Sequence, residues 1–365
     1  MKWTTKSSMI ALIAVAATAL VTSSAMAQGW GGGVEGKPAT VDELIPRMSS
    51  GQAYTERYSF AVDFDEGGHV GMNFTISNLG IRSGYGAAEF RLRLPDRDNY
   101  SYGERVSRSN WTTKEDTFAL DIDDAQIEAE GEEAFILRYN GGDVRAELRF
   151  EKQMPMWRPG NGEIRKGDDY YRFTLIAPRS NVTGRIFVDG EWRDVQGTNS
   201  GYADHVATNV APFDLAKRFT RFRNYQDNVF VMWREVHLTD DYGGDKVSWI
   251  VVGKDDKILY EDANINVEFG NLRRDSETRY AVPHAAQIKS KQGDASLRFL
   301  LRGEEVERND LLESYGRVAR AFASRFSEPY QYNVSGDYAL EVKDGKGESL
   351  SITGSSHITV DYVNH

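Results

Sequence analysis

From Tyr54 onward, the sequence is dominated by short runs of alternating apolar and polar residues, separated by turns rich in glycine, asparagine and aspartate. The runs "YSFAVDFD" and "HVGMNFTISNLG" flank a glycine turn, and "YNGGDV" contains a second tight turn. Because side chains of a strand point alternately to its two faces, this pattern predicts antiparallel strands joined by hairpins. No region alternates strands with long helices, which argues against a parallel α/β sheet.

Two sets of such runs follow one another and meet near Gly197. The chain is long enough for two domains that each bury a core. The sequence therefore predicts an all-β protein with two β domains of similar size, residues 51–196 and 197–365. Residues 28–50 are expected to form a flexible leader and one short helix.

The N-terminus is expected to be a secretory signal peptide. Lysines at positions 2 and 6 precede an apolar run from Met9 to Val21, and "AMA" ends at Ala27. The run is too short to span a membrane, and small residues flank the expected cleavage site after Ala27. The pattern favours a periplasmic or secreted protein whose mature chain has 338 residues, 365 minus 27.

Composition excludes several kinds of site and partner. The chain has no cysteine, so disulfides and thiolate metal sites are excluded. Its histidines lack metal-binding spacing and no nucleotide-binding motif is present, so no metal and no cofactor are expected. Without the two lysines of the signal, the formal net charge falls from −11 to −13, which argues against nucleic acid as a partner. The oligomeric state is left open.

One long loop, residues 153–169, interrupts the first set of strands. It carries Trp157, two methionines and two prolines. Loops of this length in compact domains are usually functional or disordered. It could act as a lid over an apolar pocket, or as a surface crossover whose tryptophan plugs a barrel end.

One amphipathic helix is expected late in the second domain, within residues 309–329. Asn309 or Asp310 would cap it, and Pro329 would stop it. The helix, 310–327, could pack on its own domain or make transient contact with a membrane.

The neighbours Asp204 and His205, with Tyr202 before them, form the strongest acid–base candidate by composition. Neighbouring residues on a strand point to opposite faces, so a working pair would require a loop. Gly197 and Gly201 allow one. The alternative is a polar pair in the connection between the domains.

The run "VFVMWREVHLT" has two half-apolar faces, as expected for a barrel wall lined inside and packed outside. Period two places five residues on one face: Val229, Val231, Trp233, Glu235 and His237. The other face carries Phe230, Met232, Arg234, Val236 and Leu238. Glu235 and His237 could then hold the polar end of a ligand.

Several segments, taken in order, resemble the survival factor 1 family. They include "SFAVDFDEGGHVGMNFTISNLGI", "YYRFTLIAPRSNVTGRIFVDGE", "KVSWIVVGKDDKILYED" and "REVHLTDDYGG", in which Glu235, Tyr242 and Gly243 match. The resemblance runs from about Tyr54 to the C-terminus. Phe213 stands where the family has a histidine, and a signal peptide replaces the family's N-terminal membrane-associating helix.

The resemblance implies two tandem lipocalin-like antiparallel β-barrels and binding of ceramide-type lipids for transfer between membranes. The wider superfamily includes AttH proteins, carotenoid 1,2-hydratases and fungal pericyclases. We therefore expect an exported protein that binds a hydrophobic small molecule or lipid, such as a ceramide, sphingolipid or isoprenoid lipid, and carries it between membranes. The expected wall or lid residues are Trp157, Tyr202, Trp233 and Trp249. The expected polar contacts are Asp204, His205 and Glu235.

Two alternatives stay open. One is a cofactor-free hydratase, cyclase or isomerase acting on an isoprenoid, in which Asp204 or Glu235 is the protonated acid and His205 is the base. The other is an envelope scaffold whose barrels are filled by their own side chains.

Overall fold

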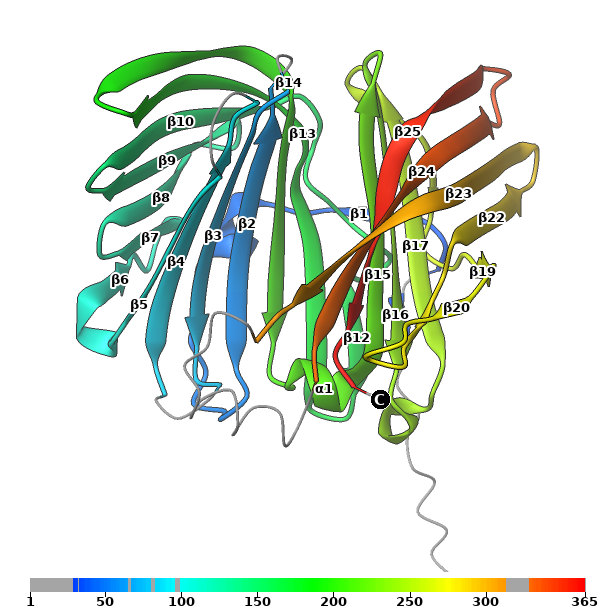
Figure 1. Ribbon diagram of the computed structural model, residues 1–365, viewed down its shortest axis with the longest axis horizontal. Helices are drawn as coiled ribbons and strands as arrows, with labels where there is room; N and C mark the ends of the chain where they lie inside the picture. The colour runs from blue at the N-terminus through cyan, green and yellow to red at the C-terminus, as the bar shows by residue number, and fades with distance from the viewer. Residues whose placement is uncertain are drawn as a thin grey trace, which may run out of the picture.

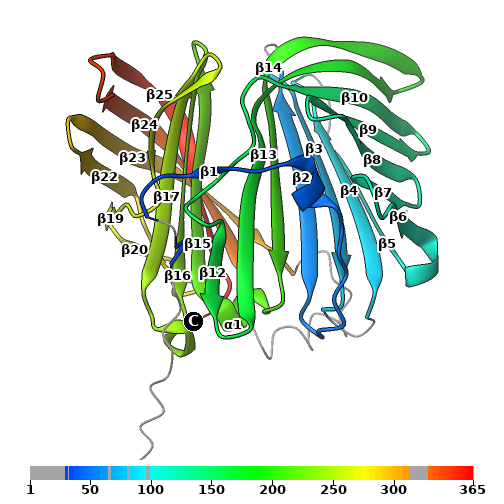
Figure 2. The ribbon, with the colours of Figure 1, turned by 180° about the vertical axis from the view of Figure 1, so that it is seen from behind.

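The structure is a computed structural model that describes residues 29–31, 33–64, 67–79, 83–95, 99–312 and 328–364, with residues 197–199 described by their backbone alone. Its regular structure is almost entirely β, arranged as two curved sheets that stand side by side (Figures 1 and 2). The expected signal peptide, residues 1–27, lies outside these ranges. Within them, no helix is long and apolar enough to cross a membrane.

The helices in the described ranges are single turns. The α-helix is α1 (Pro212–Leu215), which connects the two sheets. The 3-10 helices are η1 (Val41–Leu44), η2 (Arg108–Asn110) and η3 (Asp240–Tyr242). The architecture therefore depends on the pairing of strands and on the packing of their faces.

Sheet A has fourteen strands and its main path follows the order β5-β4-β3-β2-β14-β13-β10-β9-β8-β7-β6. The indole N–H of Trp111 in β6 donates to the carbonyl oxygen of Gly84 beside β4 at 3.0 Å, so the two ends of the path meet and the barrel is nearly closed. The strands of the path are β2 (Thr55–Asp63), β3 (His69–Ser77), β4 (Tyr85–Arg93), β5 (Tyr100–Val106), β6 (Trp111–Thr113), β7 (Ala119–Ile122), β8 (Ala125–Glu130), β9 (Ala134–Gly141), β10 (Val144–Lys152), β13 (Asp169–Val188) and β14 (Glu191–Thr208).

The long strands β13 and β14 bend sharply and so belong to both parts of sheet A. Residues 202–208 of β14 pair with β2, whereas residues 180–187 of β13 pair with β10. Between these regions the register of β13 and β14 shifts several times, from Leu175 to Gly184. Gly184 has φ +137°, and a Cβ there would lie 2.0 Å from the carbonyl oxygen of Glu147. Only glycine fits this close approach, which allows the bend.

Sheet B has nine strands in the order β18-β17-β16-β15-β25-β24-β23-β22-β19 and forms a half-barrel. Its first strand, β15, pairs with its last, β25, as well as with β16. The strands are β15 (Ala216–Gln226), β16 (Val229–Leu238), β17 (Lys246–Lys254), β18 (Lys257–Asp262), β19 (Val267–Gly270), β22 (Ala285–Gln292), β23 (Ala295–Asp310), β24 (Tyr330–Lys343) and β25 (Ser349–Tyr362). A separate hairpin joins β20 (Arg273–Arg274) and β21 (Ala281–Val282).

The predicted fold class is confirmed: the chain is nearly all-β, with two tandem lipocalin-like antiparallel sheets, of which sheet A is a nearly closed barrel and sheet B a half-barrel. The hairpin predicted around "YNGGDV" is β9–β10, and the one predicted near "EGG" is β2–β3. β14 keeps residues up to Thr208 in sheet A, and α1 leads into sheet B. The sheets therefore part downstream of the boundary expected at Gly197.

The predicted helix over 309–329 begins too early. Asn309 and Asp310 are the last residues of β23, where they pair with Gln331 and Tyr330 of β24. The Asp310 side chain does accept a hydrogen bond from the Leu312 N–H at 2.8 Å, as a capping residue would. Residues 313–327 lie outside the described ranges. The two residues predicted to cap a helix therefore end a strand instead, and the rest of the predicted helix lies outside the described residues.

An apolar cluster fills the space between the two sheets. The N-terminal strap, residues 33–45, runs across it and is seen in front of both sheets in Figure 2. Its short strand β1 (Lys37–Pro38) pairs with β11 (Trp157–Arg158), while the Val34 carbonyl accepts from the Ala263 N–H at 2.7 Å. Residues expected as a flexible leader therefore make defined contacts with both sheets.

Candidate functional site

The seven residues predicted to meet a ligand occupy three separate places. Trp157, Tyr202, Asp204 and Trp249 lie between the sheets, His205 faces the interior of sheet A, and Trp233 and Glu235 face the interior of sheet B. The structure therefore does not gather them around one pocket.

Aromatic rings close the space between the sheets. Trp249 of β17 stacks on Phe173 of β13 with ring centroids 5.2 Å apart, and it meets Trp157 at 5.1 Å. Trp157 also donates from its indole nitrogen to a carboxylate oxygen of Glu261 at 2.5 Å. A void of about 20 Å³, which is room for one water molecule, is lined by Trp30 and Tyr171 and by residues of β15 and β16 that include Thr220 and Glu235. The loop 153–169 thus inserts its tryptophan as a plug between the sheets.

Asp204 forms a buried ion pair across this interface. Its Oδ2 lies 2.5 Å from the Arg234 guanidinium and accepts from the Tyr202 hydroxyl at 2.5 Å. Burial alone would raise the pKa of Asp204, but Arg234, Arg57 and the tyrosine hydroxyl outweigh it and hold this pKa below its usual value. A carboxylate held ionised in this way suits a tie between the sheets and does not suit a protonated acid.

Of the two interpretations of Asp204 and His205, a working acid–base pair would require both side chains on one side, and they do not lie so. Both residues lie within β14, so their side chains point to opposite faces of sheet A. Gly201, which allowed a loop in the sequence, is needed for close packing instead, because a Cβ there would lie 2.4 Å from a methyl group of Val182.

His205 instead belongs to a cluster inside sheet A. Its Nε2 lies 2.9 Å from Oε1 of Glu56, and its ring stacks on Tyr58 with centroids 4.5 Å apart. The other oxygen of Glu56 accepts from the Tyr54 hydroxyl at 2.5 Å and from the Arg47 N–H at 3.3 Å. Every acceptor oxygen of this buried carboxylate is therefore used.

The pKa of Glu56 reflects this environment. Burial would raise it, but the hydrogen bonds from His205, Tyr54 and Tyr58 outweigh burial and lower the pKa below its usual value. Glu56 was not among the residues predicted from the sequence. The available signal was the alternation of Tyr54, Glu56, Tyr58 and Phe60 in "AYTERYSF", which places a carboxylate on an otherwise aromatic face.

In sheet B, the two-faced pattern predicted for β16 is confirmed. Trp233 packs in the interior core of sheet B, and Met232 and Val236 pack in the cluster between the sheets. Glu235 shares the inward face with Trp233, is 1% exposed, and accepts from Arg218 at 2.6 Å. Burial raises the pKa of Glu235, although Arg218 acts in the opposite direction. Of the two acids in the hydratase alternative, only Glu235 has an environment that favours the protonated form; that alternative stays a prediction.

A hollow of ligand size, with a volume of about 910 Å³ and open to solvent, lies at one end of sheet A. It lies where the end of β4 and the start of β5 meet the β9–β10 and β13–β14 turns. Its lining combines apolar side chains with charged residues of the turns. These residues are Leu92, Leu94, Asn99, Tyr100, Gly142, Asp143, Val144, Arg145, Phe187, Val188, Asp189 and Gly190.

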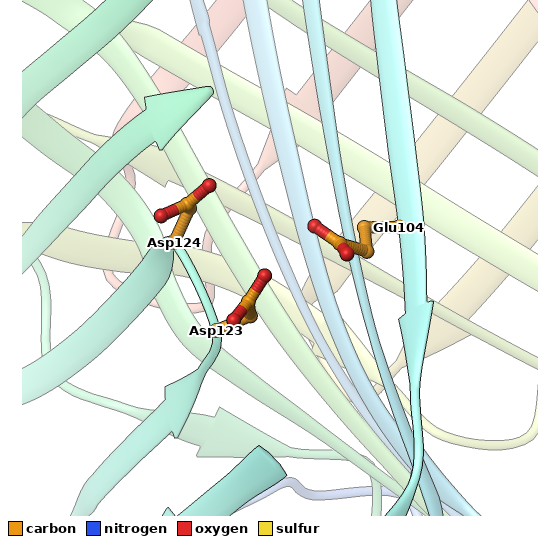
Figure 3. A group of neighbouring side chains, drawn as sticks. All are labelled: Glu104, Asp123 and Asp124. Carbon is orange, nitrogen blue, oxygen red and sulfur yellow. The ribbon is translucent and has the colours of Figure 1, made fainter. Parts of the chain in front are cut away.

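A cation could be held by an acidic group on β5 and the β7–β8 turn. The carboxylates of Glu104, Asp123 and Asp124 point toward one another, with oxygen atoms within 4.8 Å (Figure 3). Oxygen ligands of this kind suit a divalent cation such as Ca²⁺. Both aspartates are exposed, and Glu104 already accepts from Tyr102 at 2.8 Å, so the group also reads as an ordinary solvated surface.

Comparisons with known proteins agree with the fold and the order of the segments. The ceramide-binding protein SVF1 of Yarrowia lipolytica is 23% identical over an alignment that covers 84% of this chain and 85% of the relative. Among solved structures, CghA has a TM-score of 0.58 and 11% identity, covering 93% of this chain and 96% of its own. A putative AttH from Nitrosomonas europaea has a TM-score of 0.54 and 16% identity, with 87% and 98% covered. At these identities the solved structures share the fold. The model of the Svf1 family matches residues 52–363, and this chain belongs to that family.

Proposed function

We propose that this protein binds an uncharged hydrophobic lipid of the ceramide, sphingolipid or isoprenoid class, and that the hollow of sheet A receives it. The observation that carries the proposal is the volume of that hollow, about 910 Å³. Sites for small molecules usually occupy about 300–1,000 Å³ and occur in the mouths of β-barrels. The relative from Yarrowia lipolytica, named for ceramide binding, supports the same class of ligand.

The mechanism is enclosure. Alkyl chains would lie against Leu92, Leu94 and Val144, where removal from water contributes about 25 cal/mol per Å² of apolar surface. Asp143 and Arg145 stand at the same rim and offer an acceptor and a donor to a polar head group. A site with both charge signs favours a head group that has no net charge of its own.

The expected signal peptide supports a periplasmic or secreted location for this binding. A lipid in an aqueous compartment between membranes requires a carrier that shields its chains from water. We therefore infer that the protein carries its lipid between membranes.

The first test is to purify the mature protein from its own envelope and to identify bound molecules by native mass spectrometry after extraction. We expect a stoichiometric neutral lipid. A protein that is empty and takes up no lipid offered in vitro would contradict the proposal and favour the scaffold alternative.

The second test places a charge in the hollow. Leu94→Glu should weaken binding of a fluorescent short-chain ceramide at least about tenfold, because a carboxylate must then be desolvated beside the chains. Leu272→Glu is the matched control, since Leu272 is 57% exposed and does not line the hollow. Equal loss in both variants would show that the effect is one of charge and not of place.

A further inference from the structure

Three neighbouring strands of sheet B place polar side chains in one row. Thr220 of β15 lies directly opposite Glu235 of β16, which in turn lies opposite Ser248 of β17. The strands are adjacent in sheet B (Figure 1). Period two puts all three residues on the face of Phe222, Trp233 and Ile250, which belong to the interior core. We call Thr220, Glu235 and Ser248 the polar row.

Each member of the polar row is buried with an unused hydrogen-bonding atom. Thr220 and Glu235 are 1% exposed and Ser248 is 3% exposed. Thr220 Oγ1, Ser248 Oγ and Glu235 Oε2 have no hydrogen-bond partner in the described part of the chain, and neither does the indole nitrogen of Trp233. Buried polar groups in native proteins are almost always paired, so four unpaired groups in one place require an explanation.

The position of the row explains how a ligand could reach it. It lies near the ends of its strands, three residues before the last residue of β16 and two after the first of β17. β18 and β19 end the strand order of sheet B and do not pair with each other, although the Tyr260 hydroxyl of β18 donates to Ser290 Oγ of β22 at 2.6 Å. Half-buried Phe269 of β19 packs on the guanidinium of Arg218, which lies 4.6 Å from the centre of the phenyl ring. Through this contact with Arg218, Phe269 covers the row.

The charges around the row restrict the ligand. Arg218 is the cation nearest to Glu235, and the two are already paired at 2.6 Å with 11% and 0% of their side chains exposed. A phosphate bound at Arg218 would stand beside the Glu235 carboxylate and place two anions together in a buried site, which is strongly unfavourable. A hydroxyl or amide group has no such cost. It can donate to Glu235 Oε2 and accept from Thr220 or Ser248.

We propose that the polar row, with Arg218 and Trp233 beside it, is a second binding site that takes an uncharged head group bearing hydroxyl or amide groups. The class of ligand rests on the proposed lipid-binding function, but the place does not, because the row is in sheet B and the hollow is in sheet A. The rings of Trp233 and Phe222 stack with their centroids 6.1 Å apart and fill the interior beside the row. The chains of the ligand therefore extend toward the side of the sheet where β18 and β19 are not paired with each other.

The test uses the full mature chain with Thr220→Val and Ser248→Ala, which remove a hydroxyl at nearly constant shape. The probe is a soluble short-chain ceramide, and its 1-phosphate form is the charged counterpart. Each substitution should weaken ceramide binding about 3–10-fold, the worth of one hydrogen bond, while the melting temperature without ligand stays equal or rises. Wild type should bind the 1-phosphate form at least tenfold more weakly than ceramide.

The matched control is Thr208→Val in sheet A. Thr208 is also buried, but its hydroxyl donates to the Tyr170 carbonyl at 2.9 Å and accepts from the Val210 N–H at 3.1 Å. This variant should lower the melting temperature and leave ceramide affinity unchanged. If the row variants behave like the control, the row is structural and the inference is wrong.

A photoreactive short-chain ceramide then locates the site. We expect labelled peptides from 216–254, and we expect this label to persist in Leu94→Glu. Label confined to the residues that line the hollow, with wild-type affinity in the row variants, would overturn the second site and leave the proposed function intact. Absence of any ceramide binding by the wild type would overturn both.

Discussion

Two buried carboxylates face the interiors of the two sheets, and they differ in how they are satisfied. Glu56 in sheet A receives hydrogen bonds on both oxygens, from His205, Tyr58 and Tyr54, and its pKa is lowered. Glu235 in sheet B has one cation and one unused oxygen, and its pKa is raised. A saturated network fixes the structure around it, whereas an unsaturated one keeps capacity for a partner.

The largest expected effect is on the saturated cluster. Glu56→Ala should reduce the free energy of unfolding by about 3–5 kcal/mol, because removing one member of a buried pair leaves His205 and the Tyr54 hydroxyl without their acceptor, whereas Tyr58 keeps the Leu44 carbonyl oxygen. Urea denaturation followed by tryptophan fluorescence measures the loss. Glu104→Ala, on the outer acidic group, is the control and should cost well under 1 kcal/mol. A loss of similar size in both would remove the contrast between the two carboxylates.

The tie between the sheets is expected to be intermediate. Asp204→Asn should cost about 1.5–3 kcal/mol, the range for a hydrogen bond to a charged group, because Arg234 keeps a neutral acceptor but loses its counter-charge. The loss should appear in the same denaturation experiment. A change in ceramide affinity with no change in stability would instead assign Asp204 to ligand binding, as the sequence suggested.

The pH dependence of stability should carry the signature of Glu56. Because its folded-state pKa lies below the usual 4.5, its stabilising contribution is complete above pH 4.5 and is lost as the pH falls through the folded-state value. One such group changes stability by at most about 1.4 kcal/mol per pH unit. The difference between wild type and Glu56→Gln, measured by denaturation from pH 6 to about pH 3, should therefore shrink toward low pH. A constant difference would show that Glu56 is not ionised in the folded protein.

The smallest effect is the sharpest comparison between the sheets. Thr208→Val should cost about 1 kcal/mol, since it deletes a satisfied hydroxyl, whereas Thr220→Val should be neutral or stabilising by up to about 1 kcal/mol. Both residues are buried threonines on strands, so the two variants differ mainly in the pairing of the lost hydroxyl. Loss of stability in both would mean that Thr220 has a partner in solution.

The alternation of apolar and polar residues predicted the strands and the two faces of each sheet. The alternation in Val229–Leu238 correctly separated the face inside sheet B from the face between the sheets, because a regular strand has one rule for all its side chains. Glycines misled the interpretation at Gly201, where a missing side chain serves close packing of two strands and not a loop. Local sequence does not distinguish these uses, because the neighbouring strand comes from elsewhere in the chain.

Long-range pairing also hid the polar clusters. Glu56 and His205 are 149 positions apart, and the sequence around one residue does not indicate that the other is its partner. Thr220 and Ser248 were missed because a single hydroxyl in a strand is unremarked until its register with Glu235 is known. Trp157 and Trp249 were predicted as apolar contacts, but only the packing of the two sheets shows that they contact each other.

The pairing of first and last strands has a consequence for the order of folding. β2 pairs with β14 and β15 pairs with β25, which lie far along the chain, so neither sheet can be completed from local hairpins alone. Sheet A can close once the chain has reached Thr208, but sheet B needs nearly the last residue. Such distant pairings make folding slow, and until β25 arrives β15 has a free edge able to pair with another chain. The C-terminal strand β25 thus covers the edge of β15 in sheet B, and its loss would leave that edge free to pair with another molecule and aggregate.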